Sequence, residues 1–148
     1  MFAGRLVKEK GIDDLKKAIM NIPNINLIIA NSVDYEQMPE IYSKADILVI
    51  PSKKTKTWEE QYGMVLVEAM ASGVPIIAYE SGAISEVLGG TGVLIKENDI
   101  NLLTQNLRML IKDKDLRAKI GRIERRRAKV EFDSRITSKK ILKIYQEI

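Results

Sequence analysis

Short apolar segments alternate along the chain with segments whose apolar residues recur every three or four positions. Such alternation predicts a parallel β-sheet with crossover helices. The expected strands cover residues 25–30, 45–50, 75–79 and 93–95. Residues 1–3 look like the end of another strand whose beginning is missing, because strands in the centre of a sheet usually have five or six residues. We therefore expect this sequence to be part of a longer chain.

Helical patterns fill the intervals between these strands. The expected helices cover residues 12–22, 38–44, 63–72 and 84–88, one that begins at Asn98 and Asp99, and terminal helices that end at Ile148. Gly73 is placed to cap the third of them, and Pro75 follows directly. The fold class is α/β: a single doubly wound, Rossmann-like parallel sheet flanked by helices, with a C-terminal helical tail. We expect one domain over residues 1–148.

The composition restricts the possible chemistry of the protein more than it restricts the possible fold. Of the 148 residues 45% are apolar, and neither cysteine nor histidine is present. Disulfides, thiolate metal sites and a histidine base are therefore excluded. We expect a cytoplasmic location, because the chain lacks cysteine, begins without a signal-peptide pattern and contains no apolar segment of membrane-spanning length.

The net charge of +4 is concentrated near the C-terminus. Residues 112–129 contain nine basic residues and three acidic ones. Such a segment is compatible with nucleic acid, with peripheral contact to an anionic membrane, or with a solvated helix face. We favour the solvated face. Nucleic acid is not an expected partner, because Phe132 is the one aromatic residue near this segment and base stacking needs several.

Residues 4–11 form the first candidate site, a turn after the first strand. Ligands of open parallel sheets bind at the carboxyl ends of the strands, where this turn is expected. Gly4 allows close approach of the backbone, and Arg5 and Lys10 are cations that suit a diphosphate. The alternative is a surface turn with solvated cations.

Residues 60–68 form the second candidate site, at the start of a predicted helix. The amides of Gly63, Met64 and Val65 would point out of the helix N-terminus, which favours an anion. Glu68, in an otherwise apolar helix, is expected to be nearly buried and to need a ligand or a strong donor. Sugar hydroxyls are suitable donors. The alternative is an N-terminal glutamate, Glu60, that merely complements the helix dipole. Residues 79–86 predict another edge of the same pocket.

The same segments resemble the C-terminal domain of glycosyltransferase family 4, the retaining enzymes with the GT-B fold. Glu60 and Glu68, separated by seven residues, resemble the two-glutamate motif of this family. The matching segments are residues 4–11, 45–52, 58–63, 68–78, 81–86, 92–94 and 132–134. The resemblance covers nearly the whole chain and implies a nucleotide-sugar-binding domain.

The resemblance also implies roles for individual residues. Arg5 and Lys10 would bind the leaving diphosphate, and Glu60 would contact the donor sugar at the reacting centre. Gly4 and the amides of Gly63, Met64 and Val65 would approach phosphate or sugar. Glu68 would bind the ribose hydroxyls, and Val33 would meet the base through its backbone. The implied donor is a UDP- or GDP-sugar, transferred with retention and with no cofactor or essential metal.

Two departures from the family pattern limit this expectation. One helix–strand unit is missing after residues 25–30, where the family usually has it, and this affects recognition of the base. The acceptor-binding N-terminal domain is absent, so an isolated chain is expected to bind donor weakly and transfer little. The expected partners are the nucleotide-sugar and an N-terminal GT-B domain or a separate subunit. The alternative is a non-catalytic module that binds nucleotide-sugar or a partner subunit.

Overall fold

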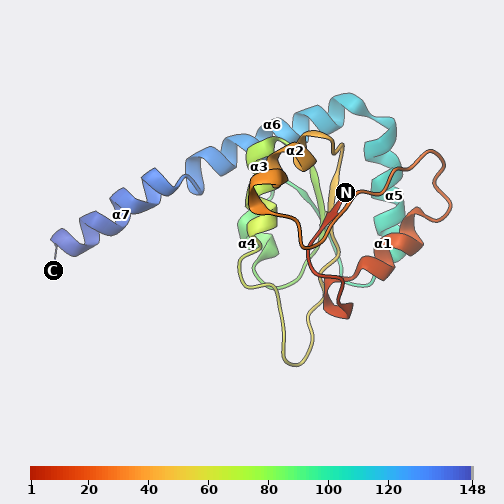
Figure 1. The fold of residues 1–148 in the computed structure, drawn as a ribbon, viewed down its shortest axis with the longest axis horizontal. Helices are drawn as coiled ribbons and strands as arrows, with labels where there is room; N and C mark the ends of the chain where they lie inside the picture. Colours follow the sequence, from red (N-terminus) through yellow and green to blue (C-terminus); the bar gives the residue numbers. More distant parts are fainter. Residues whose placement is uncertain (148) are drawn as a thin grey trace.

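The computed structural model describes residues 1–147 and has a parallel sheet at its centre (Figure 1). Its strands are β1 (Phe2–Ala3), β2 (Ile29–Ala30), β3 (Leu48–Ile50), β4 (Ile76–Tyr79) and β5 (Val93–Ile95). Parallel pairing joins β1 to β2, and β3 to β4 to β5. The Val49 amide donates to the Met1 carbonyl at 2.9 Å, which places β1 beside β3. The resulting strand order is β2-β1-β3-β4-β5.

The strand expected at residues 25–30 is shorter than predicted, because only Ile29 and Ala30 are paired. Their partner β1 contains only two residues, so the apolar residues before Ile29 have no partner strand to extend the ladder. Similarly, β3 begins at Leu48 rather than at Ala45. The strand predicted at residues 93–95 is confirmed as β5.

Helices cover both faces of the sheet. They are α1 (Ile12–Ile19), α2 (Met38–Ser43), α3 (Met64–Ser72), α4 (Ile84–Leu88), α5 (Ile100–Lys112), α6 (Lys114–Glu131) and α7 (Ser134–Gln146), with short 3₁₀ turns η1 (Lys8–Lys10) and η2 (Tyr35–Gln37). The helix expected to reach residue 22 ends at Ile19, and Met20 caps it. The predicted doubly wound α/β class is confirmed.

Successive residues of each strand point to opposite faces, so the core has two parts. Leu48 and Ile50 of β3 belong to the part packed against α2, α3, α4 and α6. Val49 belongs to the part packed against α1 and α5. Both faces of β4 are buried, which is why residues 75–79 read as a continuous apolar run.

The last helix, α7, extends away from the body (Figure 1). The helix α6 packs across the outside of α3, whereas α7 contains no buried residue. The predicted helix end at Ile148 lies outside the described residues, and α7 ends at Gln146. Most cations of residues 112–129 are exposed, as expected for a solvated helix face. Among residues 1–147, no helix is both long enough and apolar enough to span a membrane.

Candidate functional site

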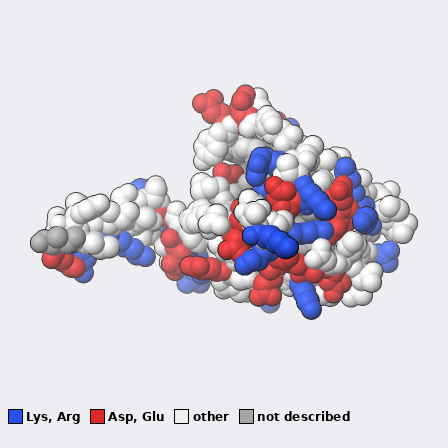
Figure 2. Space-filling model, turned by 90° about the horizontal axis from the view of Figure 1, so that it is seen from below, with Lys and Arg blue, Asp and Glu red and all other residues white. Residues whose placement is uncertain are grey.

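The candidate site lies where β1 and β3 end side by side. Connections from these strands run to opposite halves of the sheet, which makes this the point at which open α/β sheets bind ligands. A small cavity of about 70 Å³ is present there. Six of the nine predicted site residues line it: Gly4, Lys10, Glu60, Gly63, Met64 and Val65. In the view of Figure 2, basic and acidic side chains are intermixed over this end of the molecule.

Lys10 and Glu60 form an ion pair at the centre of the site. The Lys10 Nζ lies 2.6 Å from the Glu60 Oε2, and both side chains are largely buried. The Ser52 hydroxyl lies 3.3 Å from the same carboxylate oxygen, and the Lys10 ammonium lies 4.8 Å from the centre of the Trp58 ring. The ammonium therefore has two partners from the loop between β3 and α3. A partly buried pair of this kind adds little net stability, since desolvation offsets the attraction.

The main chain of Glu60 is held by the turn after β4. The Ala83 amide donates to the Glu60 carbonyl at 2.8 Å. A Cβ at Gly82 would lie 2.2 Å from the same carbonyl oxygen, so only glycine fits there. The predicted third segment thus fixes the position of Glu60, although its residues do not line the cavity. Beside it, the Ser81 hydroxyl is buried and has no hydrogen-bond partner among residues 1–147.

The N-terminus of α3 supplies the second electrostatic element of the site. Gly63 caps this helix, Met64 is its first residue, and both lie against the cavity. The first amides of a helix have no carbonyl partner within it, and the helix dipole adds partial positive charge there. Together with the Lys10 ammonium, this end of α3 favours an anionic group.

Glu68 lies farther along α3 and outside the cavity. Its side chain was expected to be nearly buried, but it is only half-buried. Its donor within the protein is the Tyr42 hydroxyl of α2, 2.8 Å from Oε2. Burial, assisted by Glu68, raises the pKa of Tyr42, so this hydroxyl stays protonated and keeps donating. An acceptor oxygen held in this way remains available to hydroxyl groups of a ligand.

Arg5 and Val33 are not brought into the cavity. Arg5 is exposed in the turn after β1 and forms no hydrogen bond or ion pair within residues 1–147. Val33 lies in the loop after β2 and packs against the core part that contains Tyr42. The structure therefore joins six predicted residues, places Glu68 nearby on α3, and leaves Arg5 and Val33 at the ends of the neighbouring strands.

Three residues of the site were not predicted as site residues: Ser52, Trp58 and Tyr42. Trp58 stood out in the sequence as the one large apolar residue of a polar loop, and that signal could have identified it. Tyr42 gave no such signal, because its contact with Glu68 depends on the packing of α2 against α3. Within residues 1–147, no group of three or more carboxylate side chains is placed to hold a metal ion.

A second hollow, of about 270 Å³, lies at the opposite end of the sheet. It is lined by the segment before β2, by the residues before β3 and by Arg117. None of the nine predicted residues borders it. We therefore base the functional argument on the smaller cavity, where the charged groups converge.

Comparison with known proteins identifies a family. The family model of glycosyl transferases group 1 matches residues 23–127, more than half of the chain. A sulfoquinovosyl transferase of Arabidopsis thaliana is 28% identical over 134 residues, which cover 87% of this chain and 24% of that protein. The chain spans less than half the length of the named relatives it matches.

Solved structures share the fold. The C-terminal domain of a group 1 glycosyl transferase from Francisella tularensis aligns with 89% of this chain and 85% of its own, at a TM-score of 0.76 and 22% identity. The Anabaena protein Alr3699/HepE, solved in complex with UDP, aligns with 99% of this chain and 48% of its own, at a TM-score of 0.85 and 20% identity. At these identities the likeness is one of fold.

Proposed function

The chain belongs to the group 1 glycosyl transferases, and we propose that it is the donor-binding, C-terminal half of a GT-B enzyme. In this proposal it binds a nucleoside diphosphate-sugar at the ends of β1 and β3. The observation that carries the proposal is the Lys10–Glu60 pair beside the N-terminus of α3. A cation, a carboxylate and unpaired helix amides meet there, and a sugar diphosphate needs all three.

The diphosphate would replace the Glu60 carboxylate as the partner of Lys10. The ammonium and the amides of Met64 and Val65 would then surround the phosphate oxygens, and Arg5 would approach them from the exposed turn. The exchange would free the Glu60 carboxylate to accept hydrogen bonds from sugar hydroxyls. The resting pair is 2.6 Å long and lines the cavity, which supports an exchange in which the ligand displaces the Glu60 carboxylate.

The transfer itself would depend on stabilisation of the leaving group. The bond between the anomeric carbon and the phosphate oxygen breaks, and its electron pair leaves with the nucleoside diphosphate. The acceptor oxygen bonds to the same face of the sugar, and its proton passes to the departing phosphate oxygen. The charge that develops there is stabilised by Lys10, Arg5 and the α3 amides. This course retains the configuration and needs no histidine base.

Glu68 would hold the ribose. Its carboxylate, oriented by Tyr42, would accept hydrogen bonds from the ribose hydroxyls, and hydrogen bonds to a charged acceptor contribute about 1.5–3 kcal/mol each. Val33 would contact the base through its backbone. The Anabaena structure contains UDP, and one relative is a GDP-mannose-dependent mannosyltransferase of Corynebacterium glutamicum, so UDP and GDP are the two ligands to test.

The first test compares two variants in calorimetric titration with UDP and GDP. Lys10→Met should weaken binding of the preferred nucleotide about tenfold or more, the effect of losing one charge-assisted hydrogen bond. Lys17→Met removes the same charge from an exposed position of α1 and should leave the affinity unchanged. Equal affinities of the two variants, or no binding of either nucleotide at millimolar concentration, would contradict the proposal.

A further inference from the structure

A second, partly buried ion pair lies on the other face of the sheet from the Glu60 carboxylate. The Lys53 Nζ lies 2.7 Å from the Asp14 Oδ2, and the Tyr79 hydroxyl donates to the same oxygen at 3.1 Å. Asp14 comes from α1, Lys53 from the segment after β3, and Tyr79 from the end of β4. The Asp14 side chain is only 7% exposed. A carboxylate buried to this degree is costly unless it is paired, and here it has two donors.

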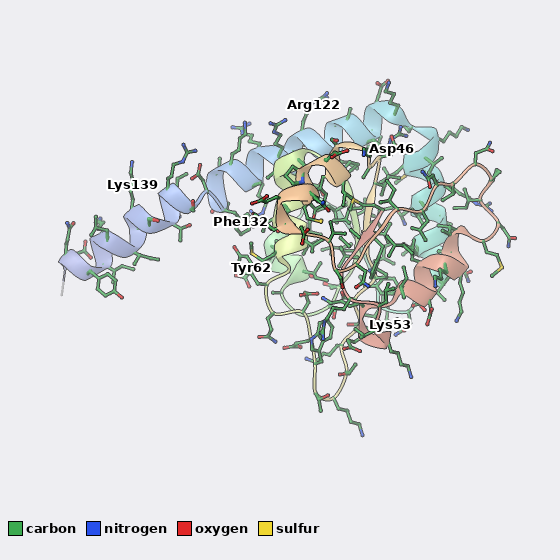
Figure 3. The ribbon with its side chains drawn as sticks, in the orientation of Figure 1. Asp46, Lys53, Tyr62, Arg122, Phe132 and Lys139 are labelled. Atoms are coloured by element: carbon green, nitrogen blue, oxygen red, sulfur yellow. The ribbon has the colours of Figure 1, made fainter. Side chains whose placement is uncertain are left out.

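This network and the candidate site share their main-chain supports. Lys53 is adjacent to Ser52, whose hydroxyl contacts Glu60. Since alternate residues of an extended segment point to opposite faces, Ser52 points toward α3 and Lys53 toward α1. Asp14 lies in the first turn of α1, four residues after Lys10, which ends η1. Figure 3 shows Lys53 beside the beginning of α1.

The turn that carries Lys10 is also fixed directly to the end of β3. The Lys53 amide donates to the Glu9 carbonyl at 2.8 Å. Gly11, between η1 and α1, packs so closely on Pro51 that a Cβ there would lie 1.9 Å from the Pro51 carbonyl oxygen. The Lys10 turn is therefore held on the end of β3 in three ways: by main-chain packing, by a main-chain hydrogen bond and by the Asp14–Lys53 pair.

We infer that Asp14, Lys53 and Tyr79 are positioning residues that hold the Lys10 turn on the end of β3 and thereby set where the Lys10 ammonium meets the diphosphate. The inference rests on the proposed function. When the Lys53 cation is absent, Asp14 keeps only the Tyr79 donor, and an outward movement of the start of α1 would solvate its carboxylate. That movement carries Lys10 away from Ser52 and Glu60. The network thus controls affinity through Lys10 and not by touching the ligand.

A double-mutant cycle tests this coupling. Lys53→Met should weaken binding of UDP or GDP, whichever the wild-type chain prefers, on the order of fivefold to tenfold. Lys53→Arg, which keeps the cation, should restore most of the affinity. Lys56→Met, an exposed lysine of the same loop, is the matched control and should change nothing. In a Lys10→Met background, Lys53→Met should have no further effect. An equal effect in both backgrounds would overturn the inference.

Hydrogen exchange separates a failure of the inference from a failure of the proposed function. In Tyr79→Phe, a milder change that leaves the ion pair in place, the amides of Gly11 and Lys53 should exchange several-fold faster, whereas those of Leu48 and Val49 should not. This measurement requires no nucleotide, and it does not depend on whether the Lys53→Met variant folds. Unchanged exchange at Gly11 and Lys53 overturns the inference. Faster exchange in a chain that binds neither UDP nor GDP supports the positioning contact and rejects the donor site.

Discussion

Glu124 of α6 is a completely buried carboxyl group outside the candidate site. Its Oε1 accepts a hydrogen bond from the Ile76 amide at 3.2 Å, and its Oε2 has no partner within residues 1–147. Burial raises the pKa of Glu124 to about 9, only partly opposed by the Ile76 hydrogen bond. The group is therefore a neutral acid at pH 7, whereas in the unfolded chain it is ionised above its ordinary pKa near 4.5.

This difference makes a prediction about stability and pH. Between about pH 5 and pH 9 the folded chain holds a proton that the unfolded chain has lost, so raising the pH weakens folding by about 1.4 kcal/mol per unit. Glu124→Gln keeps a neutral side chain of the same shape and removes this dependence. In urea unfolding at several pH values, the free energy of unfolding of Glu124→Gln should exceed that of the wild-type chain by an amount that increases as the pH rises.

The control for this prediction is Glu131→Gln, an exposed residue of the same helix. Its stability curve should run parallel to that of the wild-type chain. If the stability of Glu124→Gln also changes with pH in parallel with wild type between pH 5 and pH 9, Glu124 is not a neutral acid in the folded chain.

At the scale of elements, the position of α3 depends on α6. Gly121 of α6 is buried against the end of α3, where a Cβ would lie 2.1 Å from the carbonyl oxygen of Gly73. Gly73 is the C-cap of α3. The same helix carries Met64 and Val65 at its other end, so the close approach of α6 also fixes the amides of the candidate site.

Replacement of Gly121 should therefore destabilise the fold. In an exposed helix interior, glycine to alanine stabilises by about 0.5–1 kcal/mol, whereas overpacking costs about 1–3 kcal/mol. Because the clash is with a backbone atom, we expect Gly121→Ala to lower the free energy of unfolding. Lys119→Ala, exposed on the same helix, should be nearly neutral in the same urea titration. A gain in stability for Gly121→Ala would show that the two helices are not in contact there.

The elements were predictable where local sequence signals were sufficient. The helix at residues 84–88 and the strand at 93–95 match the predicted bounds, and Asp99 caps α5 as expected. The length of the strand at residues 25–30 was overestimated, because the length of a strand depends on its partner and β1 contains only two residues. At the site, the residue types that converge on the cavity were predictable, since parallel strands bring their ends together. The pairing of Glu68 with Tyr42 was not, because it depends on how α2 packs on α3.

At the scale of the whole molecule, the packed surroundings of the site contrast with the exposed C-terminal helix α7. The site is supported from both faces of the sheet, whereas α7 buries none of its residues. Several of its large apolar side chains are exposed, among them Leu142, Ile144 and Tyr145. In the proposed enzyme, catalysis would take place between this half and an acceptor-binding half. The chain alone is therefore expected to bind donor weakly, and tests of binding need millimolar ligand.

The most direct test maps the binding surface by NMR, with amide shifts followed during titration with UDP and GDP. The account predicts that one nucleotide shifts the amides of Lys10, Met64, Val65 and Glu68, at the end of the sheet where β1 and β3 finish. The residues around the 270 Å³ hollow at the other end, including Ile28 and Arg117, should not move. Shifts confined to that hollow, or none with either nucleotide at millimolar concentration, would contradict a donor site at Lys10 and Glu60.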